Sequence, residues 1–262
     1  MTLPKITPKQ QEIITLHYHF RFLNTNQIQK FLKHKNKKTI NTWLPDLVEK
    51  GYLKRIYDPY TFGKNTLPAV YYFGTNGIRW LKTQESLDPG AIRKLYKDGD
   101  RSETFKSNCQ LLADICLDLK AQSINGVVFD YATAQDYVSP KSTYYSFGFL
   151  SELSPQLLFS RAKNNNQSHY LLEILNASLP SYRIRKRIRT YLKFLTDYDW
   201  MENLKTPPEI LFVCQTKELL IRTKRYTKKL LVDEDNDDIH ISFALEAEVR
   251  KFGATAEVWE EA

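Results

Sequence analysis

The sequence lacks the long apolar segments that place a chain in or across a membrane. No apolar run approaches the roughly 20 residues that a membrane-spanning helix needs, and residues 1–5 contain no apolar signal segment. The 262 residues are 42% hydrophobic, which is enough to build a buried core in one or two domains. We therefore expect a soluble, cytoplasmic protein with no membrane partner.

Cysteine is also scarce. Cys109 and Cys116 are seven residues apart in a helical pattern, which puts them about 10 Å apart along the helix axis. That separation is too large for a disulfide. Cys214 lies in an apolar run. All three cysteines are predicted to be small buried side chains in a reducing compartment.

Common catalytic and metal-binding motifs are missing. The sequence has no Gly-rich phosphate loop and no Ser/His/Asp pattern, and its five histidines show no ligand spacing. The acidic run at residues 233–238 lacks the central Gly and the terminal Glu of a calcium loop. Tyr144 and Tyr145 would suit a DNA-relaxing nucleophile, but no histidine cluster accompanies them. We expect no metal site and no cofactor.

Acidic residues are few in the first third of the chain. Residues 1–88 contain fourteen Lys or Arg and only six Asp or Glu, an excess equal to the net charge of +8 of the whole chain. The rest of the chain is neutral. A positive charge confined to one region indicates a polyanionic partner.

The same region has the element order of a winged helix-turn-helix. Helices are expected at residues 8–21, 24–32 and 39–50, and two strands at 52–57 and 69–73. Thr7 can cap the first helix, with Pro8 at its first position. Pro45 lies inside the third helix, so it should bend that helix or split off its first part.

The third helix is predicted to read double-stranded DNA. Its apolar residues recur at helical spacing from Ile40 to Val48, which leaves Lys37, Lys38, Asn41 and Thr42 on the other side near its N-terminal end. In helix-turn-helix proteins this end enters the major groove, where Asn can read adenine and Lys can read guanine or hold a phosphate. We expect the DNA-binding residues to be Lys35, Lys37, Lys38, Asn41, Thr42, Lys54, Arg55 and Lys64, the last three on the DNA backbone. Two alternatives remain open: a helix-turn-helix that binds protein, or a basic turn that is only a solvated face.

A polar segment with Pro and Gly at residues 84–99 suggests a boundary between a DNA-binding domain at 1–88 and a second domain at 100–262. Helices and strands alternate in the second part, which predicts a small α/β domain within an overall α+β or α/β protein. Helices are expected at 102–121, 182–198 and 217–231. Strands are expected at 127–131, 156–161, 169–175, 209–215 and 239–244, with a hairpin turn at 163–167.

Two helices of the second part are rich in cations. Arg183, Arg185, Lys186, Arg187 and Arg189 crowd one of them, and the other has Arg222, Lys224, Arg225, Lys228 and Lys229. Each set would make a second phosphate-binding surface. The alternative is a solvated face that pairs with acids of the same domain.

The chain resembles the replication-relaxation family of plasmid and mobile-element proteins. The residues that carry the resemblance include Gln27-Ile28, Trp43-Leu44, the stretches at 47–53, 70–73 and 170–174, and the stretch at 208–213. The resemblance implies a winged helix followed by a domain of the restriction-endonuclease-like, PD-(D/E)xK fold. It also implies a bacterial protein associated with the nucleoid or a plasmid, with a role in replication, relaxation or transfer.

The nuclease signature of that fold is incomplete. Such a site needs acids that hold Mg²⁺ and a Lys two residues after the second acid. Here Gln156 stands at the first acid position, Glu173 is retained, and Leu175 replaces the Lys. Glu103, Asp114 or Asp130 could add a ligand, but nothing in their spacing selects one. We expect no cleavage; a metal-dependent nuclease or nicking enzyme with a site around Glu173 and Mg²⁺ is the alternative.

The sequence therefore predicts a sequence-specific DNA-binding accessory factor or regulator of a plasmid or mobile element. Its expected partners are double-stranded DNA, a relaxase or replication initiator, and a second copy of the chain as a homodimer.

Overall fold

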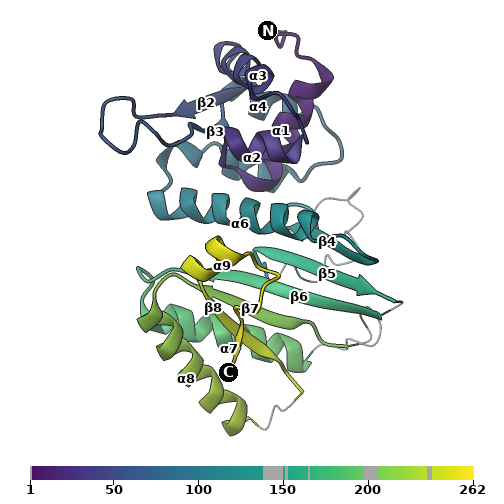
Figure 1. Ribbon diagram of the computed structural model, residues 1–262, viewed down its shortest axis with the longest axis vertical. Coiled ribbons are helices and arrows are strands. Elements are labelled where there is room, and N and C mark those ends of the chain that lie inside the picture. The colour runs from purple at the N-terminus through teal and green to yellow at the C-terminus, as the bar shows by residue number, and fades with distance from the viewer. Residues whose placement is uncertain are drawn as a thin grey trace. The chain divides into compact units, whose positions relative to one another are not determined.

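The protein is a mixed α+β structure in a computed structural model (Figure 1) that describes residues 2–137, 150, 153–164, 166–197, 204, 206–234 and 238–262. The described chain forms two compact units, which divide after Leu117. None of the helices in this part of the chain is long and apolar enough to cross a membrane.

The first unit combines helices with a small antiparallel sheet. The sheet has the order β1-β3-β2, with β1 at Leu23–Asn24, β2 at Leu53–Ile56 and β3 at Val70–Phe73. The helices are α1 (Pro8–Phe20), α2 (Thr25–Phe31), α3 (Lys37–Glu49), α4 (Thr75–Leu81), α5 (Pro89–Leu95) and the first part of α6 (Glu103–Ala121). In Figure 1 the loop between β2 and β3 projects away from the helices of this unit.

Side-chain caps explain why the first two helices begin where they do. Thr7 and Gln10 form a reciprocal capping box at α1, and Asn24 and Gln27 form another at α2. In each box the side chain of one residue accepts from the backbone N–H of the other, which satisfies two donors that the helix leaves unpaired. The cap expected at Thr7 is confirmed.

Pro45 does not split α3. The helix is continuous from Lys37 to Glu49, with Ile40, Leu44 and Leu47 buried. Pro45 is exposed, so the carbonyl of Asn41, which loses its helical donor, lies on the solvent side of the helix. The buried residues on both sides of Pro45 hold one helix together, and the expectation of a split is wrong.

The segment at residues 84–99 is a folded part of the first unit. Asp88 accepts a hydrogen bond from Ala91 N at 2.5 Å and caps α5, with Pro89 at the first turn. Asp98, in a short 3-10 helix at Asp98–Asp100, is fully buried and forms an ion pair with Arg21. The Pro and Gly that suggested a linker mark a helix start, and the division between compact units falls later, inside α6.

The second unit is built on a six-stranded sheet of order β4-β5-β6-β7-β8-β9. β6, β7 and β8 are parallel neighbours, and the other pairs are antiparallel. The strands are β4 (Val127–Thr133), β5 (Leu157–Lys163), β6 (Asn166–Leu175), β7 (Glu209–Cys214), β8 (Ile241–Leu245) and β9 (Glu260–Glu261). The short β1 and β9 were not expected from the sequence.

Helices connect the parallel strands, as such strands require. α7 (Ser181–Asp197) links β6 to β7, and α8 (Lys217–Asp233) links β7 to β8. α7 lies behind the sheet in Figure 1, and α9 (Glu246–Phe252) lies in front of it. Tyr191 of α7 packs edge-on against Phe212 of β7, with 5.5 Å between the ring centroids. This packing fixes the inner face of α7 against the sheet and leaves its other face to solvent.

Candidate nucleic-acid interface

A fixed turn leads into α3 and exposes its basic residues. Gln29 Nε2 donates to the backbone oxygen of His34 at 3.0 Å, and the ring of His34 packs edge-on against Trp43 at 5.2 Å between centroids. The side chain of Asn36 accepts from Lys38 N at 2.8 Å and begins the helix. Lys35, Lys37 and Lys38 are therefore held in place by their backbone while their side chains stay exposed.

Residues of α3 and of β2 line one open hollow of about 300 Å³. Lys37, Asn41 and Pro45 follow one another at i, i+4 and i+8, so they lie on the same face of α3. Arg55 of β2 reaches the same hollow from the sheet. The remaining lining residues are Thr25, Tyr57, Leu67, Pro68, Ala69 and Tyr71. Helix α3 and strand β2 therefore share one surface.

Aromatic contact holds Arg55 in this surface. Its guanidinium carbon lies 4.6 Å from the ring centroid of Tyr57, and its strand partner is Tyr71. A guanidinium on an aromatic face keeps its N–H groups for an anion. Lys54 lies next to Arg55, and successive side chains of a strand point to opposite faces. The structure therefore directs Lys54 away from the hollow.

The other predicted residues are exposed but do not line the hollow. Lys38 and Thr42 form the neighbouring stripe of α3, where Thr42 Oγ1 donates to Lys38 O at 3.2 Å. Lys35 lies in the turn before the helix. Lys64 lies in the β2–β3 loop, which is folded on itself by bonds from Tyr60 N and Thr61 N to Asp58 Oδ1 at 3.1 and 3.0 Å. Of the eight predicted residues, Lys37, Asn41 and Arg55 are brought together.

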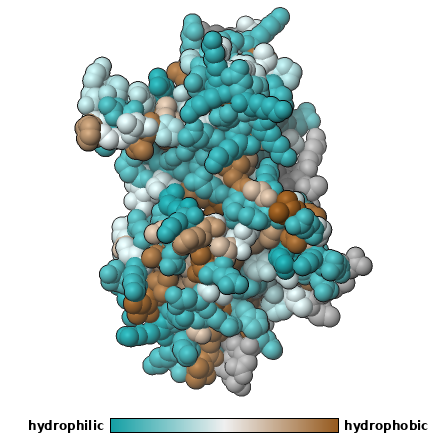
Figure 2. Space-filling view, viewed as in Figure 1, coloured by the Kyte–Doolittle hydropathy of each residue, from teal (hydrophilic) through white to brown (hydrophobic). Residues whose placement is uncertain are grey.

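Sequence reasoning missed two features of this surface. Pro45 lines the hollow, which its i+4 spacing from Asn41 could have indicated. The loop between β2 and β3 also exposes apolar side chains: Phe62 is 99% exposed and Leu67 is 60% exposed. Figure 2 shows the apolar colour at the outer end of this loop. Because most residues of this loop are polar, the sequence pattern did not single out these two apolar side chains.

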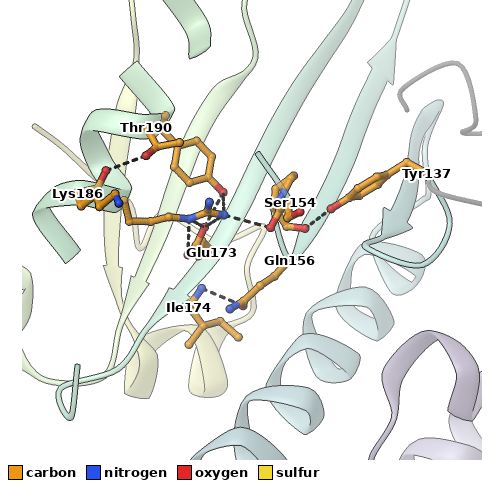
Figure 3. A network of polar contacts seen from close by, with 10 residues as sticks. Tyr137, Ser154, Gln156, Glu173, Ile174, Lys186 and Thr190 are labelled. Atoms are coloured by element: carbon orange, nitrogen blue, oxygen red, sulfur yellow. Dashed lines mark hydrogen bonds and ion pairs between the residues drawn. The ribbon is translucent and has the colours of Figure 1, made fainter. Parts of the chain in front are cut away.

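In the second unit, Glu173 of β6 is engaged by other side chains (Figure 3). Its carboxylate accepts from Arg187 Nε at 2.7 and 2.9 Å and from the Tyr191 hydroxyl at 2.7 Å. Arg187 Nη2 lies 2.6 Å from Glu173 Oε2 and also donates to Ser154 O at 3.1 Å. Both carboxylate oxygens of Glu173 therefore accept hydrogen bonds from the guanidinium of Arg187.

The electrostatics of this cluster follow from its burial. Burial alone would lower the pKa of Arg187, but its hydrogen bonds and ion pair with Glu173 raise the pKa above the ordinary value. Burial, followed by the charge of Glu173, raises the pKa of Tyr191 well above 10. Arg187 thus stays charged and Tyr191 stays neutral, and each remains a donor to Glu173.

The residues at the positions expected for a nuclease signature have structural roles. Gln156 Oε1 accepts from Ile174 N at 3.1 Å, which ties the segment before β5 to β6. Leu175 is buried and apolar. Among the residues that the structure describes, no three His, Cys, Asp or Glu side chains are grouped to hold a metal ion. Of the candidate extra ligands, Asp130 is exposed on β4, while Glu103 and Asp114 belong to the other unit.

One of the five residues predicted to form a basic surface on α7 does not face solvent. Arg187 is only 25% exposed and is paired with Glu173, so it does not belong to a solvent-facing surface. Arg183, Arg185, Lys186 and Arg189 are exposed. Tyr144, Tyr145 and the central residues 235–237 of the acidic run lie outside the described part of the chain.

Comparisons with known proteins do not assign a family. No family model and no curated protein matches the sequence. One solved structure that matches is that of restriction endonuclease FokI, with 11% identity and a TM-score of 0.33, over 94% of this chain and 43% of that one. The chain spans less than half the length of that structure. At these values the likeness carries no argument about the site, and the resemblance to the replication-relaxation family gains no support from a family match.

Proposed function

We propose that this chain is a sequence-specific double-stranded DNA-binding protein whose first unit is a winged helix-turn-helix. In this proposal α2 and α3 form the helix pair, α3 enters the major groove, and the β2–β3 ribbon is the wing. The observation that carries the proposal is the shared hollow, where Lys37 and Asn41 of α3 meet Arg55 of β2. The positive excess of residues 1–88 supports it independently.

Each residue of the surface has a distinct role in this proposal. Asn41 offers an amide that can bond to both N6 and N7 of adenine, and Lys37 can donate to guanine or to a phosphate. Arg55 and Lys64 hold the DNA backbone beside the groove, and Lys38, Thr42, Lys35 and Lys54 add contacts along the edges. Base readout is thus assigned to α3, and positioning to the residues around it.

The biological setting is proposed from the residue resemblance alone. We assign the protein to an accessory or regulatory role in the replication, relaxation or transfer of a plasmid or mobile element. A relaxase or replication initiator is the partner that this role would require. The second unit would be a restriction-endonuclease-like scaffold that no longer cleaves, and it could serve homodimer formation.

Binding to selected duplex DNA should weaken steeply with salt. If Lys37, Lys38, Lys54, Arg55 and Lys64 each displace a counterion, log K should fall against log salt with a slope of about −4 to −5. Selection from a random duplex library, followed by fluorescence anisotropy over a range of salt concentrations, measures this slope. Absence of salt-dependent binding to any duplex would contradict the proposal and favour a winged helix that binds protein.

Supercoiled DNA should remain supercoiled when incubated with the protein and Mg²⁺ or Mn²⁺. A metal ion at Glu173 would have to displace the Arg187 guanidinium and the Tyr191 hydroxyl, and the amide of Gln156 is a poor replacement for a second carboxylate. Gel electrophoresis of the DNA measures the outcome. Nicked or linear product that disappears with Glu173→Gln would establish the nuclease alternative.

A further inference from the structure

A second hollow, of about 520 Å³, lies between α7 and α8 in the second unit. Four of its seven lining residues are cations and only one is acidic. The lining residues are Arg185 from α7 and Glu218, Ile221, Arg222, Arg225, Tyr226 and Lys229 from α8. The hollow is built by one unit alone, so it does not depend on the surface around α3.

The cations are arranged in a row along α8. Arg222, Arg225 and Lys229 follow at i, i+3 and i+7, which puts them on one face of the helix over about 10 Å. Successive phosphates of one DNA strand are about 3.4 Å apart along the duplex axis. A row of this length can therefore face about three phosphates.

α7 adds two arginines that flank one aromatic ring. The guanidinium carbons of Arg185 and Arg189 lie 5.2 and 5.8 Å from the ring centroid of Tyr226. Aromatic contact fixes a guanidinium while leaving its N–H groups available to an anion. Because the guanidinium groups crowd the ring, it is poorly placed to stack on a base, and the hollow is suited to phosphates.

These cations are not neutralised by the protein where the structure describes it. Within the described residues, the ion pairs of α7 and α8 join Arg187 to Glu173 and Lys224 to Glu260. No described carboxylate lies within ion-pair distance of Arg185, Arg189, Arg222, Arg225 or Lys229. Like charges at i and i+4 destabilise a helix. Arg225 and Lys229 stand in this relation, as do Arg185 and Arg189, and a bound anion would remove the repulsion.

Tyr226, which lines the hollow, has a hydroxyl that no described residue satisfies. Its hydroxyl oxygen is buried and has no hydrogen-bond partner within the described residues. A buried hydroxyl without a partner is unfavourable, because it has lost its hydrogen bonds to water without replacing them. A phosphate oxygen that enters the hollow and reaches this hydroxyl would be an acceptor for it.

We propose that the hollow between α7 and α8 binds the phosphate backbone of a nucleic acid, as a second contact separate from the α3 surface. The contact is independent of base sequence, since the hollow presents cations and a hydroxyl rather than groups placed to read bases. It goes beyond the winged-helix proposal because it holds whether or not α3 reads DNA. Together the two surfaces would let one chain contact DNA at two places.

The test uses the full chain with Arg222, Arg225 and Lys229 all changed to Gln, and a fluorescent duplex of random sequence. The loss of about three phosphate contacts should reduce the steepness of the salt dependence by about 2 to 3 in log–log slope. Affinity at low salt should fall at least about tenfold. The matched control changes Arg183, Lys186 and Lys228 to Gln, which removes the same charge outside the hollow.

The control should change the slope by less than about one. Equal effects in the two variants would overturn the proposal, because they would report only net charge. Tyr226→Phe should leave thermal stability unchanged or raised, since it removes an unsatisfied hydroxyl, while weakening the binding of DNA several-fold. Tyr226→Phe that lowers stability and leaves binding unchanged would contradict the role given to the hydroxyl.

Two further measurements distinguish this proposal from the winged-helix proposal and from the binding of an acidic protein. The hollow variant is also measured with Lys37, Asn41 and Arg55 changed to Ala. If the winged-helix proposal is wrong, the chain with these three changes to Ala binds DNA like the native chain. Altering the hollow in that chain then still reduces the slope of log K against log salt. Polyglutamate serves as the competitor. If the native hollow binds polyglutamate, and the hollow variant binds duplex DNA as well as the native chain does, the partner is an acidic protein and the proposal is wrong.

Discussion

Changing Lys37, Asn41 and Arg55 together to Ala is expected to reduce the affinity for a selected duplex at least about 100-fold. A bidentate contact from Asn to adenine contributes about 1–3 kcal/mol of discrimination, and two cations that leave the DNA backbone add to the loss. A total of about 3–5 kcal/mol corresponds to this change or a larger one, at 1.4 kcal/mol for each tenfold. Titration by fluorescence anisotropy at fixed salt concentration measures it.

The matched control for this variant lies on and just after α4. Arg79, Lys82 and Gln84 supply the same two cations and one amide away from the hollow, and the two cations are exposed. Changing them to Ala should lower the affinity only a few-fold, through net charge. If the two triple variants bind equally well, the hollow is not the DNA-binding surface.

Removal of the Arg187 side chain should strongly destabilise the second unit. Arg187→Ala leaves the carboxylate of Glu173, which is only 13% exposed, without its cation. Breaking a buried ion pair in this way costs about 3–5 kcal/mol, out of the 5–15 kcal/mol that is typical of a whole domain. Because Arg187 is 25% exposed, we expect the lower end of this range. Urea unfolding followed by circular dichroism measures it.

A double replacement separates the ion pair from simple packing. Replacing both Glu173 and Arg187 with Leu removes both charges, so it should be less destabilising than Arg187→Ala alone. The hydroxyl of Tyr191 then loses its acceptor, which keeps the double variant below the native protein in stability. An Arg187→Ala protein with an unchanged unfolding midpoint would show that Glu173 does not need its cation.

Local features of the fold could be predicted because their causes are local. The boxes at Thr7 and Asn24 depend on residues three apart, and the buried stripe of α3 follows directly from helical periodicity. The strands β1 and β9 have two residues each, which is too short for a pattern. α5 was missed because Pro89 and Gly90, read as breakers, occupy its first turn.

The candidate sites could be predicted only in part, since they depend on contacts between distant residues. The shared face of Lys37 and Asn41 follows from their spacing, but the position of Arg55 depends on the pairing of β2 with β3 across a long loop. The spacing of Arg187 from Ile184 and Tyr191 puts it on the inner face of α7, but its pairing with Glu173, fourteen residues away, depends on the packing of α7 against β6. The hollow between α7 and α8 likewise needs the packing of two helices.

The base preference of an Asn41→Ala variant tests the central claim most directly. Selection from a random duplex library, with sequencing of the bound fraction, gives the preferred bases of the native and variant chains at every position of the site. If α3 reads the major groove through Asn41, the variant loses its preference for adenine at one position and keeps the preferences elsewhere. Identical preferences in the two proteins would contradict the account.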